Sequence, residues 1–457
     1  MSEKMTRRDF VKISGLAAGL GAIGSVGCAQ TAQVMASDTK MAKAPMVGTG
    51  VKAQLPAAKG PRLVVVGAGT SGLTIAKYAK KNYPKFDVVM VDKRDMYSSC
   101  FNSSLWYAGI VDLEFLANHS FLDAAVNNDY IYFNSTVIGL DRAARKVITS
   151  DGEIDYDFVL FAPGISYDYE RSGITDPYTI ATLKQKYPGG FISPMEHVTI
   201  KRKIDEFEGG VFVQNVPAGN YRCLPGPYER ACIIADIFKK NNIKGKVLVL
   251  DGNPEITIKA KGFHAAFDEL YKDIIEWKPS SDIKGVDVDK KIITTEFDSY
   301  PFDDACIYPH VRGNTLLEQC GLMGDTKKTT QKEANIDTRF YNLIGDDRVY
   351  CSGDARFQPY SKSANTSNTE GHFVAKVLAA RVQGKEIPWE TPETVCYSMV
   401  EAFPPEAIGV VAHYVYDPAK DAITGFSPDT KTFEDRQEAR GKTYLEWAKG
   451  IYRDTFN

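Results

Sequence analysis

In the first third of the chain, continuous apolar runs alternate with a segment in which apolar residues recur at helical spacing. Residues 63–66 are a continuous run of leucine and valine, which is typical of a strand buried on both faces of a parallel sheet. Residues 73–81 place apolar side chains at helical spacing, and the break at residues 82–84 includes a proline. Residues 87–92 form a second apolar run that ends in an aspartate. The order of strand, helix and strand predicts a βαβ unit in a parallel sheet.

The turn between the first strand and the helix has the pattern G-x-G-x-x-G, with its glycines at Gly67, Gly69 and Gly72. The first glycine permits a tight turn, the second lets the backbone approach a pyrophosphate, and the third allows close packing of helix and strand. The N-terminus of the helix then faces the phosphate charge. Asp92, at the end of the second strand, is expected to accept hydrogen bonds from ribose hydroxyls. These four residues predict a dinucleotide-binding site.

Two later segments favour FAD over NAD as this dinucleotide. Residues 348–355 predict a short strand ending in Gly353 and Asp354, followed by a loop and a helix over residues 367–382. Residues 156–164 predict another strand and turn. Both segments resemble those of FAD enzymes of the glutathione reductase class, in which such an aspartate holds the ribityl chain and the helix directs its positive end at the flavin. We therefore expect an α/β flavoprotein.

A second βαβ pattern has strands predicted at residues 210–213 and 246–251. The segment between these strands contains no G-x-G-x-x-G, and residues 215–230 include three prolines, which have no N–H to offer a phosphate. Cys223 lies in this segment, at the place where a nicotinamide ring would approach the flavin. We therefore predict a central Rossmann-like domain that lacks an NAD phosphate loop.

The motifs around the cysteines resemble the flavoprotein subunit of flavocytochrome c sulfide dehydrogenase over nearly the whole of the chain after residue 36. Besides the glycine turn, the resemblance is carried by residues 97–102 (YSSCFN), 221–231 (YRCLPGPYERA), 395–398 (VCYS) and 451–456 (IYRDTF). It implies a periplasmic FAD enzyme that oxidises sulfide or a related reduced sulfur compound and passes electrons to a c-type cytochrome subunit. The chain has no C-x-x-C-H, so a haem would lie on another polypeptide.

The resemblance also implies roles for single residues. Cys100 corresponds to the cysteine that binds the FAD 8α-methyl covalently, and an ordinary buried thiol is the alternative. Cys223 corresponds to one half of a redox-active disulfide, and we expect the helix that begins near Tyr228 to lower its pKa. Glu229 corresponds to a glutamate near that sulfur and is a candidate proton acceptor, although a helix dipole also favours an acid in the first turn. Independently of the resemblance, Lys362 is a candidate counter-charge for a reduced flavin, with a solvated lysine as the alternative.

The family's second redox cysteine has no counterpart at the corresponding segment, residues 331–340. Cys306, Cys320 or Cys351 could pair with Cys223 instead, and burial in a core is the ordinary alternative for each. Without such a pair, sulfide would attack the flavin directly, or the donor would be a different sulfur compound.

The N-terminal residues 1–36 predict an export signal. Paired arginines precede an apolar, Gly/Ala-rich run over residues 13–27, which is the pattern of a twin-arginine signal for the periplasm and is too short to span a bilayer. One expected outcome is cleavage after Ala36, and the other is lipidation of Cys28. Residues 37–60, rich in alanine, lysine, proline and glycine, are predicted to be a linker.

Composition excludes classes of function. Lys plus Arg number 55 and Asp plus Glu 58, so the chain lacks the basic excess typical of nucleic-acid binding. The six histidines show no metal-ligand spacing, and no metal site is predicted.

The predicted organisation has two Rossmann-like domains of the glutathione reductase/sulfide dehydrogenase type and a C-terminal region. The FAD domain comprises residues 61–168 and 316–385, the central domain 169–315, and an interface region 386–457, which in the family helps to dock the cytochrome. Two alternative functions stay open: a sulfide:quinone or NAD(P)H-linked flavin oxidoreductase, and a non-catalytic flavoprotein that only transfers electrons.

Overall fold

The computed structural model describes residues 50–324 and 329–457. The predicted signal at residues 1–36, with Cys28, and residues 37–49 of the predicted linker lie outside the described residues. The described part of that linker, residues 50–60, is not a free connection, because its first residues pair with a strand. The backbone N–H of Gly50 donates to the Glu153 carboxylate at 2.8 Å, and Lys52 forms a parallel bridge with Glu153 in β8 (Gly152–Asp155).

The first apolar runs form the centre of a six-stranded sheet with the order β19-β20-β9-β1-β2-β5. These strands are β19 (Asn342–Leu343), β20 (Asp346–Cys351), β9 (Phe158–Phe161), β1 (Arg62–Val66), β2 (Asp87–Asp92) and β5 (Ile131–Asn134). All neighbours are parallel except the edge pair β19 and β20. Val64 pairs with Val89 on one side and with Val159 on the other, and all three side chains are fully buried. The strands predicted from the apolar runs are confirmed.

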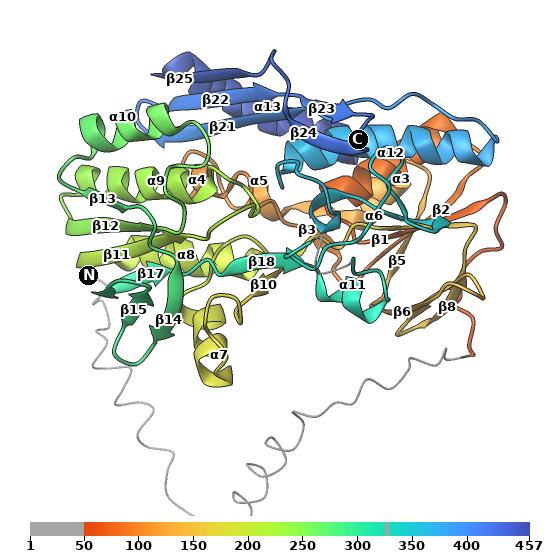
Figure 1. The fold of residues 1–457 in the computed structure, drawn as a ribbon, viewed down its shortest axis with the longest axis horizontal. Coiled ribbons are helices and arrows are strands. Elements are labelled where there is room, and N and C mark those ends of the chain that lie inside the picture. The colour runs from red at the N-terminus through yellow and green to blue at the C-terminus, as the bar shows by residue number, and fades with distance from the viewer. Residues whose placement is uncertain (1–49, 325–328) are drawn as a thin grey trace, which may run out of the picture. The chain divides into compact units, whose positions relative to one another are not determined.

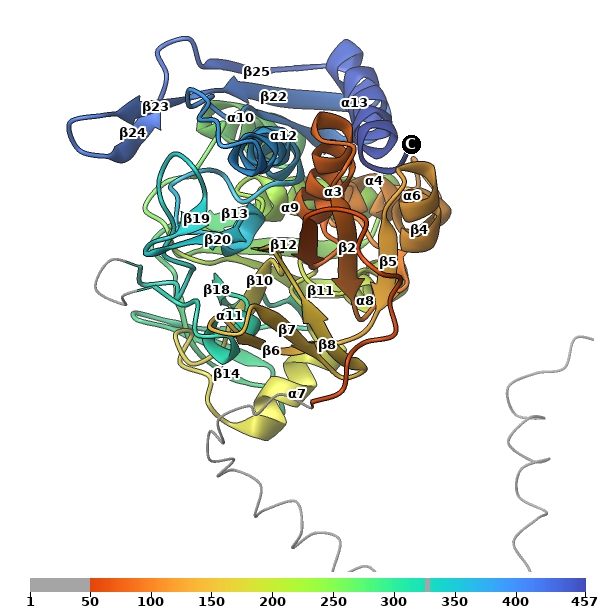
Figure 2. The same cartoon turned by 90° about the vertical axis from the view of Figure 1, so that its right-hand side faces the viewer.

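Helices cover one face of this sheet and a β-meander covers the other (Figure 2). The helices α3 (Thr70–Asn82) and α12 (Ala364–Val382) pack against each other, so closely that a Cβ on Gly371 would lie 3.1 Å from the Thr74 side chain. The meander consists of β6 (Val137–Asp141), β7 (Lys146–Thr149) and β8. Both helices begin three residues before their predicted starts. Ser363 explains the second start, because its hydroxyl caps the N–H of Thr366.

The second βαβ pattern forms a four-stranded parallel sheet with the order β13-β12-β11-β17. These strands are β13 (Ile275–Lys278), β12 (Lys244–Asp251), β11 (Gly209–Val216) and β17 (Asp304–Cys306), and helix α9 (Gly226–Lys240) connects β11 to β12. An antiparallel ribbon of β10 (Ile165–Asp168) and β18 (His310–Gly313) runs between the two sheets (Figure 1). Two sheets of this kind confirm the α/β fold class.

The C-terminal region packs on both parts of the molecule. It contains β21 (Thr394–Glu401), β22 (Glu406–Ala412), β23 (Tyr414–Asp417), β24 (Ala422–Phe426), β25 (Lys431–Gln437) and α13 (Glu438–Phe456). Strand β21 lies along α9, where the N–H of Met399 donates to the Glu229 carboxylate at 3.0 Å. Helix α13 reaches α3 and α12 through Asp454, which accepts hydrogen bonds from Tyr78 at 2.5 Å and Asn368 at 2.8 Å. The region is therefore part of the packed body as well as a surface.

The remaining elements connect these parts of the fold. They are β3 (Met96–Tyr97), α4 (Ser103–Tyr107), α5 (Glu114–Ala117), β4 (His119–Ser120), α6 (Phe121–Asn127), α7 (Pro177–Lys186), α8 (Pro194–Glu206), α10 (Ala260–Leu270), β14 (Ile283–Asp287), β15 (Ile292–Thr295), β16 (Ser299–Pro301), α11 (Thr315–Gln319) and the 3-10 turn η2 (Gly353–Ala355). Of the helices in the described residues, none combines the length and apolar character that a bilayer-spanning helix needs.

Candidate functional site: a flavin cavity

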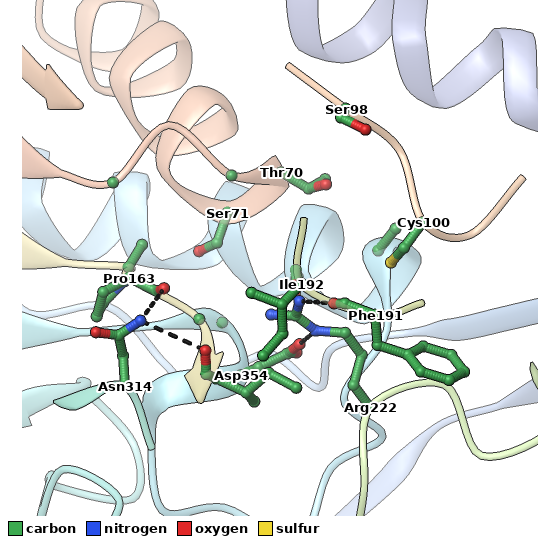
Figure 3. Close-up of a pocket in the computed structure, with 18 of the residues that line it drawn as sticks. Thr70, Ser71, Ser98, Cys100, Pro163, Phe191, Ile192, Arg222, Asn314 and Asp354 are labelled. Atoms are coloured by element: carbon green, nitrogen blue, oxygen red, sulfur yellow. Dashed lines mark hydrogen bonds and ion pairs between the residues drawn. The ribbon is translucent and has the colours of Figure 1, made fainter. Parts of the chain in front are cut away.

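A cavity of about 700 Å³ lies beyond the carboxyl ends of the FAD-domain strands. The loops after β1, β2, β9 and β20 contribute Gly67, Arg94, Pro163 and Asp354 to its wall, and Figure 3 shows part of it. Open α/β sheets bind ligands in the crevice beyond the strand ends, where the strand order reverses. Strand β1 occupies that position, because it lies between β2 and β9.

The three glycines of the turn have different surroundings. A Cβ on Gly67, which has a φ of +101°, would lie 2.6 Å from the carbonyl oxygen of Ala162, and one on Gly72 would lie 2.0 Å from that of Gly67. A Cβ on Gly69 would meet no protein atom within 4 Å, because this residue faces the cavity. Helix α3 starts there without a side-chain cap and without an acidic residue in its first turn. Its free N–H groups therefore fit the pyrophosphate of a dinucleotide.

Asp92 lies at the end of β2 with its carboxylate almost fully buried. Burial alone would raise its pKa, but hydrogen bonds from Arg94 and the N–H of Ala68 bring the pKa below its ordinary value. Asp92 is therefore ionised at the cavity wall, as its predicted ribose contact requires. The neighbouring Arg94 is a cavity residue for which the sequence pattern gave no signal.

Asp354 has one carboxylate oxygen engaged and one free. Its Oδ2 accepts a hydrogen bond from Arg222 Nε at 2.5 Å, whereas its buried Oδ1 has no partner among the described residues. Arg222 also donates to the carbonyl oxygen of Phe191 at 2.6 Å (Figure 3). A buried carboxylate oxygen without a partner is costly, and a ribityl hydroxyl would satisfy it. The residues of the cavity thus fit FAD, with Asp354 and the preceding Gly353 at the predicted place.

Cys100 follows β3 and lines the same cavity. Burial raises the pKa of its thiol, while the nearby charge of Arg222 lowers it and that of Asp354 raises it. Figure 3 shows Cys100 across the cavity from the glycine turn, on the side of Arg222. The sulfur is therefore separated from the pyrophosphate end and placed toward the end expected to hold the flavin ring.

Cys223 lies in the proline-rich loop before α9 and also lines the cavity. Its backbone is left-handed, with a φ of +62°, and is held by hydrogen bonds of 2.8 Å to the carbonyl of Lys362 and from the N–H of Gly226. The prediction that the helix lowers its pKa is wrong. Burial raises the pKa well above the ordinary value, and nearby negative charges add to this effect. The loss of water exceeds what the helix N-terminus can supply.

Glu229 lies in the first turn of α9, is buried and lines the cavity. Burial raises the pKa of its carboxyl to about 7, although the hydrogen bond from the N–H of Met399 and the charge of Lys259 oppose the rise. A carboxyl that titrates near neutral pH can both take up and release a proton, which suits the predicted role of proton acceptor.

Lys362 is fully buried and forms an ion pair with Glu333. The alternative of a solvated lysine is therefore wrong. The residue lines the cavity, and its carbonyl fixes the loop that carries Cys223.

The three cysteines proposed as partners for Cys223 do not line the cavity. Cys306 is buried in β17, whereas Cys320 and Cys351 are buried in the core of the FAD domain. The cavity is instead lined by a cysteine that the sequence did not single out for chemistry, Cys396 of β21.

Two further cavity residues escaped the sequence analysis. Arg222 precedes Cys223 in the motif of residues 221–231, and only this position in the sequence indicates that it belongs to the site. Asn314 donates to the carbonyl oxygens of Pro163 at 3.1 Å and Ile165 at 3.4 Å, and no motif marks it. Across residues 50–324 and 329–457, no group of three His, Cys, Asp or Glu side chains is placed to hold a metal ion.

Three family models match successive parts of the chain. Residues 61–183 match the pyridine nucleotide-disulphide oxidoreductases. Residues 198–308 match the central part of the sulfide dehydrogenase (flavocytochrome c) flavoprotein chain, and residues 391–456 match the flavin-binding part of flavocytochrome c sulphide dehydrogenase.

A curated protein that resembles this chain has low sequence identity to it. The mitochondrial sulfide:quinone oxidoreductase of Schizosaccharomyces pombe is 23% identical over 275 residues, which span 55% of this chain and 56% of that protein. This chain thus spans about half the length of that curated relative.

Among solved structures, the sulfide:quinone oxidoreductase of Aquifex aeolicus has a TM-score of 0.69 at 15% identity, over 87% of this chain and 92% of its own. The covalent complex of putidaredoxin reductase and putidaredoxin has a TM-score of 0.58 at 16% identity, over 86% and 93%. These likenesses show the fold. Together with the three family matches and a cavity that fits FAD, they lead to one assignment: the chain belongs to the flavoproteins of flavocytochrome c sulfide dehydrogenase, a family of FAD-dependent oxidoreductases.

Proposed function

We propose that this protein oxidises sulfide, or a related reduced sulfur compound, and transfers the electrons to FAD. The observation that carries the proposal is the position of Cys223, whose thiol lines the same cavity as the FAD residues Gly69 and Asp354. A sulfur atom at this position can exchange bonds with a sulfur substrate.

The loop that carries Cys223 supports a sulfur compound, and not a nicotinamide, as the electron donor. In a nicotinamide-binding domain this loop would present free N–H groups to a pyrophosphate. Here it contains Pro217, Pro225 and Pro227, and Tyr221 is buried within it with its hydroxyl donating to the carbonyl of Leu224 at 2.8 Å. The loop is shaped to present a thiol.

FAD, when bound, supplies a two-electron acceptor. Cys223 provides the sulfur that bonds with the substrate, and Glu229 holds or releases a proton near neutral pH beside it. Arg222 fixes Asp354 for the ribityl chain and places a positive charge in the cavity, where it favours anionic sulfur species. Hydrogen bonds from Arg222 to Asp354 and from the N–H of Met399 to Glu229 hold these groups in place.

The electron acceptor and location complete the proposal. We propose a c-type cytochrome subunit as acceptor, docked in part through residues 386–457, and a periplasmic location reached through the twin-arginine pattern of residues 1–36. The family matches and the absence of a C-x-x-C-H in the sequence support a separate cytochrome. The purified, sulfide-reduced protein should reduce a c-type cytochrome from the same source faster than a soluble quinone analogue, and the reverse order would contradict this acceptor.

Anaerobic stopped-flow absorbance of the flavin tests the reaction. Sulfide should bleach the flavin of the wild-type protein, and Cys223→Ser should slow the bleaching by about 100-fold or more, because the exchangeable sulfur is lost. Cys232→Ser is the matched control, since Cys232 is a buried cysteine of α9 that does not line the cavity. Bleaching of Cys223→Ser at the wild-type rate would contradict the proposed role.

A further inference from the structure

A second thiol shares the cavity with Cys223. Cys396 projects from β21, a strand that lies along α9, and both cysteines line the cavity as free, partly accessible thiols. Among the charges that act on the Cys223 thiol, a thiolate at Cys396 raises its pKa more than Cys100 or Glu229 does. The order of these effects ranks Cys396 as the strongest electrostatic neighbour of Cys223.

Lys259 distinguishes Cys396 from the other cysteines. This lysine precedes α10 and is buried, with its ammonium donating to the Ser398 hydroxyl at 2.7 Å and contacting Cys396 Sγ at 3.8 Å. The charge of Lys259 acts on the nearby Glu229 carboxyl, but no salt bridge joins Lys259 to a carboxylate within the described ranges, 50–324 and 329–457. A buried ammonium is stable only with a compensating charge nearby. Burial and the charge of Glu229 hold the pKa of the Cys396 thiol above its ordinary value, and the charge of Lys259 opposes this rise. A thiolate formed at Cys396 during the reaction would supply the compensating charge for Lys259.

The other cysteines are less suited to pair with Cys223. Cys306, Cys320 and Cys351 do not line the cavity. Cys100 lines it, but Cys100 is the residue expected to carry the flavin, and the ammonium of Lys259 contacts Cys396 instead. Cys396 is therefore the available cavity thiol with a built-in counter-charge.

We propose that Cys396 is the second redox cysteine of this protein, and that it forms with Cys223 a disulfide that receives the sulfur substrate. The proposal rests on the proposed function, to which it adds the partner that the sequence lacks at residues 331–340. It also assigns a role to Lys259, which stabilises Cys396 as the leaving thiolate.

The reaction balances in three steps, with hydrosulfide as the substrate. Hydrosulfide attacks Cys223 Sγ, the S–S bond to Cys396 breaks, and Cys223 becomes a persulfide while Cys396 leaves as a thiolate beside Lys259. A second hydrosulfide attacks the outer sulfur of the persulfide, releasing hydrodisulfide and a Cys223 thiol. The Cys223 thiol and the Cys396 thiolate then reform their disulfide, and the two electrons and one proton pass to FAD. The sum is two hydrosulfides and oxidised FAD giving one hydrodisulfide and anionic reduced flavin.

Peptide mapping of the air-oxidised, purified holoprotein tests the pair directly. After alkylation and tryptic digestion without reductant, mass spectrometry should find residues 223–230 linked to residues 386–420, because trypsin cleaves after Arg222, Arg230, Lys385 and Lys420. Treatment with sulfide before alkylation should remove the link and leave a persulfide-derived mass on the 223–230 peptide. A link from Cys223 to any other cysteine, or an unlinked Cys223 in the oxidised protein, would overturn the proposal.

The rate at which sulfide reduces the flavin of Cys396→Ser gives a second, kinetic test. Cys320→Ser is the control, because Cys320 is buried away from the cavity. Cys396→Ser should slow sulfide reduction of the flavin by at least about 10-fold while leaving reduction by dithionite unchanged, which shows that fold and flavin are intact. Reduction of the Cys396→Ser flavin by sulfide at the wild-type rate would contradict the role of Cys396 as the second redox cysteine.

The two proposals can fail separately. If sulfide bleaches the wild-type flavin but no link between Cys223 and Cys396 exists, the disulfide is wrong and the proposed function stands. If the link exists but sulfide does not bleach the flavin, the proposed function is wrong and the disulfide stands.

Discussion

Glu229 and Cys223 are neighbours in the cavity wall, and both lose water there. Burial is the largest cause of the raised pKa of each group, and it raises that of Glu229 to about 7. Burial of this kind is typical of functional carboxyls, because a proton acceptor works best when its pKa is close to the working pH. Glu229 therefore connects the stability of the protein to pH.

We predict that wild-type stability falls as pH rises from about 4.5 to 7, relative to Glu229→Gln. The folded protein holds the Glu229 proton to about pH 7, whereas the unfolded chain releases it near 4.5, so the folded state binds more protons in this window. Above pH 7 the wild-type protein should lose about 3 kcal/mol relative to the variant. Urea unfolding at pH 5 and pH 8 measures this difference, and a pH-independent difference would contradict the raised pKa.

A covalent flavin link at Cys100 is a separate prediction. If Cys100 binds the 8α-methyl of FAD, acid precipitation of the wild-type protein should leave the flavin on the polypeptide, and Cys100→Ala should release it into the supernatant. Cys351→Ala, a buried cysteine outside the cavity, should behave like the wild type in flavin retention. Release of the flavin from the wild-type protein would show that FAD is held without a covalent bond.

At the scale of elements, the glycine turn and α3 form the part of the site that local sequence predicts best. Apolar runs of β1 and β2, the three glycines and Asp92 all lie within one short βαβ segment, so their spacing alone defines their arrangement. The cavity-facing Gly69 and the packed Gly72 nevertheless serve different purposes, which a substitution can separate.

We predict opposite results for Gly69→Ala and Gly72→Ala. The backbone of Gly69 is extended, with φ −78° and ψ −179°, and a methyl group there meets no protein atom, so the apoprotein should keep its stability while FAD affinity falls by at least about 10-fold. A methyl group on Gly72 would collide with the carbonyl of Gly67, so that variant should lose about 1–3 kcal/mol of folding stability. FAD titration and urea unfolding of both apoproteins measure the two effects. Equal loss of stability would contradict the assignment of Gly69 to the ligand.

Contacts between distant elements set the limit of what sequence could predict. Cys396 reaches the cavity because β21 packs along α9, and neither the period nor the composition of residues 394–401 indicates that neighbour. The same holds for Lys259 and Asn314, whose roles depend on which loops meet at the cavity. Sequence also placed the Cys223 thiol beside a helix N-terminus, but it could not measure the burial that raises the pKa of that thiol.

At the scale of the whole molecule, the two parallel sheets, the β10–β18 ribbon and the C-terminal strands converge on one cavity. The FAD domain provides the glycine turn and Asp354, the central domain provides Cys223 and Glu229, and the C-terminal region provides Cys396 and its neighbours. The expected boundaries of these domains stay a prediction. An arrangement in which three regions each supply a chemical group explains why the C-terminal region does more than present an outer surface.

We propose that electrons enter this flavoprotein through a thiol and not through a nicotinamide. Anaerobic stopped-flow mixing of the oxidised holoprotein with sulfide or with NADH, each in excess, distinguishes these two routes. We expect rapid bleaching of the flavin by sulfide and at least about 100-fold slower bleaching by NADH. Rapid bleaching by NADH, with sulfide without effect, would contradict it.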